Sequence, residues 1–173
     1  MLVAAIFIVF PFCMAYAAIS DMLSMTIANR VSLLLVATFL IIAPLTGMTW
    51  SDYGWHLAAG VVVLSVTFTL FAIGGMGGGD AKLLAGTALW MGFGQELMQY
   101  LVYSAAFGGL LTMLILVYRR SPLSVYTGHN IFLRNLADRD VGIPYGIALG
   151  LGGIATYPNT ALVQWALDRA AGI

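Results

Sequence analysis

Charged residues are scarce in this 173-residue chain: they make up 8% of it, whereas 61% of the residues are hydrophobic. A soluble globule of this length cannot hide so many apolar side chains in its core. The formal net charge is zero, so the chain carries no basic field of the kind that attracts nucleic acid, and we predict no nucleic-acid partner. We therefore expect an integral membrane protein.

Cysteine and histidine are also scarce. Cys13 is the single cysteine and lies inside an apolar run, which excludes an intrachain disulfide and a cysteine-based metal site. We interpret it as a filler that faces lipid or the core. His56 and His129 are the two histidines, and we expect each to be interfacial or solvated rather than a ligand. The serine-hydrolase pattern Gly-x-Ser-x-Gly does not occur. We predict no metal and no cofactor.

Long apolar runs are abundant. A bilayer crossing takes about 20 residues, with tolerance for tilt, and six runs approach that length. They are 2–19, 31–48, 56–74, 81–95, 98–118 and 142–166. The fourth run is short and the sixth is rich in glycine. We predict an all-α, polytopic membrane helix bundle of about six transmembrane helices with a short, broken fourth helix, forming a single domain over 1–173.

The cationic residues indicate how the chain is oriented. With six crossings, segments 20–30, 75–82 and 119–141 share one side and hold six of the seven Lys and Arg residues, while Arg169 lies on the other side. Cationic loops are retained in the cytoplasm, so we expect these three segments to be cytoplasmic. We interpret Arg119 and Arg120 as positive-inside anchors in contact with anionic membrane lipid.

A glycine-rich run, GGMGGGD from Gly74 to Asp80, separates two apolar stretches. Glycine does not hold a helix and lets another segment approach closely, so a helix must end here. Irregular backbone survives in a membrane only where it is buried in protein or lines a wet cavity, and an aspartate at such a place is a functional candidate. The simpler alternative is a turn whose Asp caps the next helix.

Asp21 and Asp80 are expected to lie at the same end of the bundle. Asp21 closes the first span, Asp80 opens the fourth, and an even number of crossings separates them. Across a wet cavity of low dielectric, two such carboxylates would share a proton. That pair can activate water and protonate a carbonyl, as peptide hydrolysis requires. Without His or Cys nearby, the same two groups make a poor metal cage.

Three motifs carry a resemblance to one family. Gly77-Gly78-Gly79-Asp80, followed by Ala-Lys-Leu-Leu, resembles the Gly-x-Gly-Asp motif of the intramembrane aspartic peptidases, specifically the type IV prepilin peptidases. The other two motifs are an Asp before an Ile-Pro-Asn turn and a Pro-Tyr-Gly element that opens the last helix. Their counterparts here are Ser20-Asp21 with Thr26-Ile27-Ala28-Asn29-Arg30, in which Ala28 stands in the place of the Pro, and Pro144-Tyr145-Gly146.

The resemblance implies a membrane-embedded aspartic endopeptidase in which Asp21 and Asp80 are the catalytic pair. It implies further that the enzyme cleaves the leader of a type IV, Flp-type prepilin or pseudopilin at the cytoplasmic face of the bacterial inner membrane. The remaining motif positions are implied to form the active-site loops or to pack helices near the site. The loop residues are Gly77, Gly78, Gly79, Lys82 and Asn29, and the packing residues are Pro144 and Gly146.

The chain resembles the short members associated with tight-adherence pili. The long members carry paired cysteines that bind zinc, in an extra domain, and methylate the new N-terminus. With one cysteine here, we expect no separate methyltransferase domain.

Two other functions compete with this interpretation. A small transporter would use Asp80 to bind a cation within a broken helix, and a non-catalytic pilus or secretion assembly component would need neither aspartate. Lys82 either tunes Asp80 or extends to the membrane interface. Asp138 and Asp140 are candidate contacts for a positive leader, and reversing their charge should then slow processing.

Overall fold

The computed structural model describes residues 1–127 and 129–172, and all regular structure in that part of the chain is helical. The longer helices are α1 (Leu2–Ser24), α2 (Asn29–Leu45), α3 (Trp50–Ala72), α4 (Gly78–Met91) and α5 (Gln95–Arg120). The shorter ones are α6 (Leu123–Thr127), α7 (Arg134–Ala137), α8 (Tyr145–Thr156), the 3-10 helix η1 (Tyr157–Asn159) and α9 (Ala161–Ala171). The all-α prediction is confirmed for the described residues.

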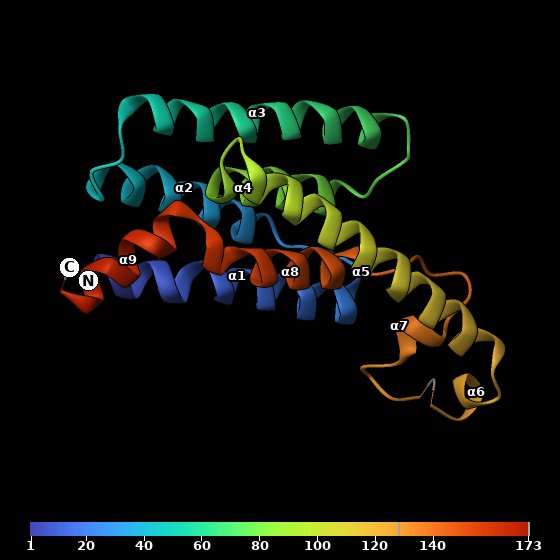
Figure 1. Ribbon diagram of the computed structural model, residues 1–173. Helices are drawn as coiled ribbons and strands as arrows, with labels where there is room; N and C mark the ends of the chain where they lie inside the picture. Colours follow the sequence, from blue (N-terminus) through green and yellow to red (C-terminus); the bar gives the residue numbers. More distant parts are fainter. Residues whose placement is uncertain (128, 173) are drawn as a thin grey trace.

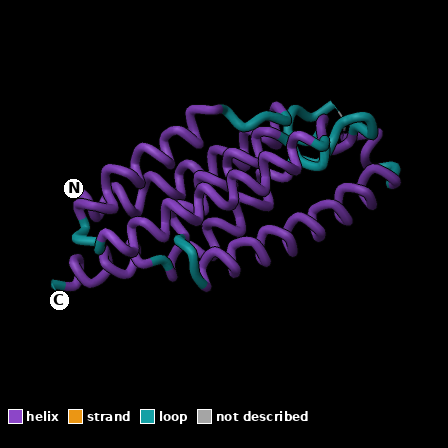
Figure 2. Tube along the Cα trace, turned by 90° about the horizontal axis from the view of Figure 1, so that it is seen from above, coloured by secondary structure: helices purple, strands orange, loops and turns teal. Residues whose placement is uncertain are grey.

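The helices lie alongside one another with α4 in the interior (Figures 1 and 2). α3, α2 and α8 all pack on α4, and α8 also packs on α1 and α5. Every residue from Leu83 to Met91 is buried, which requires a segment that is apolar on all sides. We call the end of the bundle where α1 ends and α4 and α8 begin the site end. Beyond it, α6 and α7 form a small lobe, and both termini lie at the opposite end (Figure 1).

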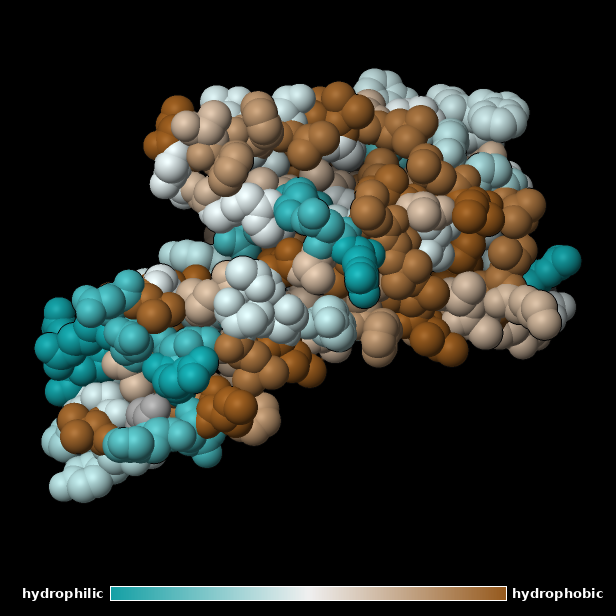
Figure 3. Space-filling view, turned by 180° about the vertical axis from the view of Figure 1, so that it is seen from behind, coloured by the Kyte–Doolittle hydropathy of each residue, from teal (hydrophilic) through white to brown (hydrophobic). Residues whose placement is uncertain are grey.

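Three helices are long and apolar enough to cross a membrane: α1, α3 and α5. Less than a third of each span is buried inside the protein, so the rest of its apolar surface faces outward and suits lipid. Figure 3 shows this hydrophobic cover, with hydrophilic residues gathered at the end that carries α6 and α7. The chain is therefore a membrane protein; length and composition identify three of its helices as candidate spans, and the count of six stays a prediction.

The other three expected spans do not meet the length of a membrane crossing, and the reason differs among them. α2 is apolar but has 17 residues, and α4 has 14, which at 1.5 Å per residue reaches only about 21 Å. The expected sixth span, 142–166, is not one helix: α8 ends at Thr156, η1 follows, and α9 begins at Ala161. Pro158 lies at the start of η1, where its missing N–H and fixed φ prevent α8 from continuing.

An aromatic cluster packs α1, α2, α4 and η1 together at the end of the bundle away from the site. Phe10 stacks on Tyr157 with ring centroids 4.0 Å apart, and Phe39 and Trp90 complete the cluster. Trp90 Nε1 donates to the Leu35 carbonyl at 3.0 Å. A buried polar group in an apolar interior needs a hydrogen-bond partner. The bond to Leu35 therefore allows the indole of Trp90 to be buried in this core.

His56 belongs to the same interior and not to a solvated surface. Its ring is 8% exposed, and its Nδ1 pairs with the Leu89 carbonyl at 2.6 Å. Gly92 ends α4 with a φ of +74°, and a Cβ there would lie 2.7 Å from His56 Cε1. The expectation of an interfacial or solvated His56 was wrong, because this ring closes α3 onto the last turn of α4. His129 is exposed, as expected.

Candidate active site

Asp21 lies in the last turn of α1, where the helix is stopped by Met25 in a left-handed conformation (φ 54°). The side chain is only 6% exposed. Its Oδ2 accepts a hydrogen bond from the Gly146 backbone N–H at 2.7 Å. Gly146 is the second residue of α8, so this N–H is one of the donors that a helix leaves free at its start. A carboxylate is thus held at a helix N-terminus, where the dipole favours negative charge.

Asp80 lies in the first turn of α4, which begins after Gly77. The chain reaches that point from α3 through a turn in which Gly74 takes a φ of +78° and the Gly75 N–H donates to the Leu70 carbonyl at 2.8 Å. A helix does end in the glycine run, as predicted, but Asp80 is not the cap residue, since Gly77 occupies that position. The Asp80 side chain is half-buried.

Ile27 is the contact that joins the three sequence motifs. A Cβ on Gly79 would lie 3.3 Å from both the backbone nitrogen and Cβ of Ile27. A Cβ on Gly146 would lie 3.0 Å from Ile27 Cδ1 and 2.8 Å from Asp21 Cβ. Because a larger residue at either glycine would push against Ile27 or the carboxylate, the missing side chains set how closely α4 and α8 approach the end of α1.

Asn29 and Lys82 form the second link between motifs. Lys82 Nζ donates a hydrogen bond to Asn29 Oδ1, which connects the start of α2 to the start of α4. The structure gives Lys82 an amide partner, while a tuning effect on Asp80 stays a prediction. Ala28, which replaces the family's Pro, has a φ of −63° and a ψ of 136°. Those angles are the ones proline adopts, so the turn keeps its shape without it.

A cleft of about 550 Å³ opens beside Asp80 between α4 and α5. The Gly74–Gly77 turn and Leu84 form one wall, and α8 contributes Tyr145 and Leu149. The α5 wall is made of Leu101 and small residues, namely Ser104, Ala105, Gly108 and Gly109. Ser104 is 7% exposed, and its Oγ has no hydrogen-bond partner among the residues described. The small residues of the α5 wall leave room in the cleft for an extended chain.

Arg119 is a buried clamp that the sequence did not reveal. It is 7% exposed, and its guanidinium donates to the carbonyls of Leu136, Val141 and Gly142, each at 2.9 Å. The expectation that Arg119 is a lipid anchor was wrong, since these bonds hold the segment that leads into α8. Arg120, its neighbour in sequence, is exposed, and its contact with lipid stays a prediction.

Asn135 connects the same segment to α1. Its Nδ2 donates to the carbonyls of Met22 at 3.1 Å and Leu23 at 2.8 Å, the two residues that follow Asp21. The last carbonyls of a helix lack partners inside it, so Asn135 satisfies the end of α1. Arg119 and Asn135 together fix the α7–α8 connection above the two aspartates. No sequence signal distinguishes Asn135 from the other polar residues of this loop, such as Asn130 and Arg134.

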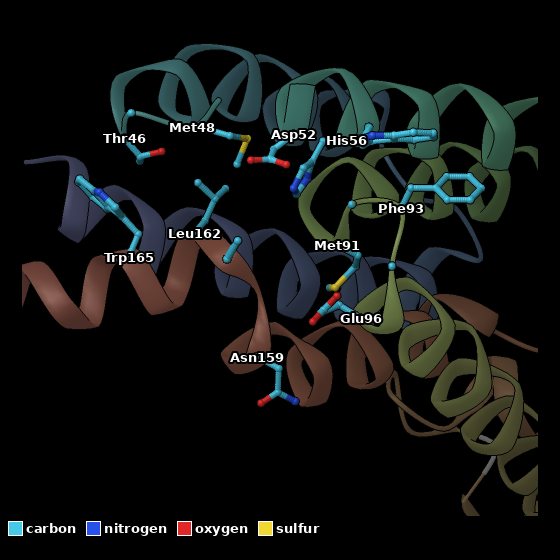
Figure 4. Close-up of a pocket in the computed structure, with 15 residues that line it drawn as sticks. Thr46, Met48, Asp52, His56, Met91, Phe93, Glu96, Asn159, Leu162 and Trp165 are labelled. Carbon is cyan, nitrogen blue, oxygen red and sulfur yellow. The ribbon is translucent and has the colours of Figure 1, made fainter. Parts of the chain in front are cut away.

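Another cavity, of about 730 Å³, lies at the opposite end of the bundle and contains none of the predicted site residues. Figure 4 shows Asp52, His56 and Glu96 around it, with Phe93 and Trp165. Asp52 is engaged in capping α3, because its Oδ2 accepts from Thr49 Oγ1 at 2.7 Å. Across residues 1–127 and 129–172, no three His, Cys, Asp or Glu side chains lie together so that they could hold a metal ion.

Comparison with known proteins assigns the chain to a family. Residues 8–117 match the type IV leader peptidase family. No curated protein and no solved structure matches the chain. The matched region is more than half of the chain and includes Asp21 and Asp80, whereas Gly146 lies beyond it. The chain therefore belongs to the type IV leader peptidase family, whose members are aspartic peptidases that act on prepilin leaders.

Proposed function

We propose that Asp21 and Asp80 are the catalytic pair of this peptidase and that the substrate enters the cleft between α4 and α5. The observation that carries the proposal is geometric: Ile27 lies against both Gly79, next to Asp80, and Gly146, which donates a hydrogen bond to Asp21. The two carboxylates, from distant motifs, are thereby gathered beside that cleft. Family membership favours a peptidase over a transporter or a non-catalytic assembly component, the two alternatives that the sequence left open.

The arrangement suggests how the two groups divide the reaction. The Gly146 N–H stabilises negative charge on Asp21, so we assign the ionised role to Asp21 and the protonated role to Asp80. Asp21 takes a proton from the attacking water as Asp80 protonates the carbonyl oxygen of the scissile peptide. The tetrahedral intermediate then collapses: one of its two hydroxyls returns a proton to Asp80, Asp21 gives its proton to the leaving nitrogen, and the C–N bond breaks. The glycine turn at 74–77 leaves room for the extended substrate backbone beside Asp80.

The substrate we propose is a type IV prepilin or pseudopilin of the Flp type. The support is the resemblance to the short family members and the single cysteine, because the zinc-binding cysteines of the long members are not among these residues. Co-expression with a Flp-type precursor and with a classical type IV precursor tests this. We expect cleavage of the first and little of the second, and equal cleavage of both would remove the proposed specificity.

The catalytic assignment is tested in the same assay with single substitutions. Asp21→Asn and Asp80→Asn keep the shape of each side chain but remove its ionisation, so each should abolish the cleaved band while membrane levels stay unchanged. Asp52→Asn, at the opposite end of the bundle, is the control and should cleave normally. Processing that persists in either active-site variant would refute the pair.

We also propose that the site end faces the cytoplasm of a bacterial inner membrane and that α1 to α5 and the α8–α9 segment make six crossings. The support is the distribution of cationic residues. In a Cys13→Ala background, Ser51→Cys should react with an impermeant maleimide in spheroplasts, whereas Tyr126→Cys should react only after lysis. Both positions are exposed. Labelling of Tyr126→Cys from outside would reverse the orientation.

A further inference from the structure

A second groove lies on a different side of α4 from the cleft and shares no lining residue with it. It has a volume of about 530 Å³ and runs between α2 and α3, with Ala85, Gly86 and Leu89 of α4 as its floor. Along α2 it extends from Asn29 to Leu40, which at 1.5 Å per residue is about 16 Å. That length matches one leaflet, since the hydrocarbon core of a bilayer is about 30 Å thick.

The groove is polar only at the site end. Lys82 and Asn29 line that end, and no Asp or Glu is among its lining residues. The contact of Lys82 with an amide oxygen leaves the ammonium charge without compensation. α2 also begins here, at Asn29, and its cap residue Ala28 offers no side-chain hydrogen bond. A helix start with free N–H groups and a nearby cation attracts an anion.

Ser32 supplies an independent sign of a ligand. It lies one turn beyond Asn29 on α2, lines the groove and is 8% exposed. Its Oγ has no hydrogen-bond partner in the described part of the chain, which is unfavourable in an apolar interior. Three residues of helix put it about 4.5 Å deeper than Asn29. Beyond it the lining is apolar, formed by Leu33, Val36, Leu40, Leu57, Val61 and Leu64.

We propose that this groove binds one anionic glycerophospholipid. The phosphate lies at Lys82 and the first N–H groups of α2, an ester carbonyl of the glycerol backbone accepts a hydrogen bond from Ser32, and one acyl chain fills the apolar part. This order of anion, carbonyl and hydrocarbon is that of a phospholipid, whereas a peptide would need further polar partners for its backbone. The uncompensated charge of Lys82 favours a lipid with net negative charge over a zwitterionic one.

Native mass spectrometry of the full chain in detergent tests the proposal, with dioleoyl phosphatidylglycerol and dioleoyl phosphatidylcholine as the added lipids. We expect the wild type to retain one phosphatidylglycerol with about tenfold higher affinity than phosphatidylcholine. Lys82→Gln should abolish this preference. Arg169→Gln removes an exposed cation in α9, at the opposite end of the bundle, that does not line the groove, and it should leave the preference unchanged. Equal retention of the two lipids by the wild type, or an equal effect of both variants, would overturn the proposal.

Ser32→Ala separates lipid binding from folding. It removes a buried hydroxyl without a partner, so the melting temperature of the lipid-free protein should stay equal or rise. Affinity for both lipids should fall about fivefold, because the ester carbonyl is common to them. Val36→Trp fills the acyl part of the groove and should weaken binding of both lipids as well. Unchanged affinity in Ser32→Ala and Val36→Trp would show that the lipid lies elsewhere.

Discussion

Gly146→Ala is the substitution that most directly tests how the structure positions Asp21. A Cβ at this position would lie 2.8 Å from Asp21 Cβ and 2.9 Å from Asp21 Oδ2. Ordinary contact between carbon atoms is about 3.5–4.0 Å, so α8 and the aspartate must separate by roughly 1 Å. Gly146 does not have a positive φ, and the change therefore tests steric contact without adding backbone strain.

The separation breaks the hydrogen bond from the Gly146 N–H to Asp21, which is 2.7 Å long. Hydrogen bonds to charged groups contribute about 1.5–3 kcal/mol. If that stabilisation is lost from the transition state, the rate falls about 10- to 150-fold. A displacement of 1 Å in a catalytic group lowers the reaction rate by about 100-fold. We therefore expect kcat to fall by about two orders of magnitude.

The assay is the rate of precursor cleavage by the purified enzyme in lipid nanodiscs, with membrane level and melting temperature measured in parallel. Gly142→Ala is the matched control. It lies four residues away, and its Cβ would meet only Met25 Cε at 3.7 Å, which is ordinary contact. It should cleave at the wild-type rate. Wild-type kcat in Gly146→Ala would refute the role of α8 in holding Asp21, and an equal loss in both variants would point to a general defect.

Two further predictions concern the walls and the support of the site. Gly109 lines the cleft, so Gly109→Leu should fill it and lower kcat/KM at least tenfold. The fold should tolerate the change, because nothing lies within 4 Å of a Cβ at this position. Gly54→Leu, which is equally unobstructed and lies outside the cleft, should have no effect, and normal cleavage by Gly109→Leu would exclude the cleft as the substrate path. Arg119→Gln should destabilise the protein by about 3 kcal/mol through its lost carbonyl partners and expose the α7–α8 connection to protease, whereas Arg120→Gln should do neither. An unchanged melting temperature in Arg119→Gln would refute the clamp.

The sequence allowed the membrane class, the helical fold and the shared end of Asp21 and Asp80 to be predicted. The first two depend on composition and on the apolar runs, and the third depends on whether an odd or even number of apolar runs separates the two aspartates. All of these can be read along the chain. The glycine run was informative for the same reason, since no helix can easily continue through it. The catalytic roles of the two aspartates stay predictions, supported by the family match.

Features that depend on contacts across the bundle were not predictable. Arg119 has the sequence context of a lipid anchor, yet it bonds to carbonyls more than fifteen positions away. His56 lies beside interfacial aromatics in sequence, but the end of α4 covers it. The break after Thr156 was missed because 142–166 was judged by overall hydrophobicity, although Pro158 was a local signal for it.

The short length of α4 determines the depth of Asp80. Thr67 Oγ1 donates to the Ala81 carbonyl at 3.4 Å, so the start of α4 lies level with Thr67 and not with the end of α3 at Ala72. Five residues of helix separate the two levels by about 7.5 Å. Asp80 is therefore within the length of the α3 span, where water is excluded unless the protein admits it. The cleft beside Asp80, with its glycine turn and its wall of small residues, is the feature that can bring both water and an extended peptide to that depth.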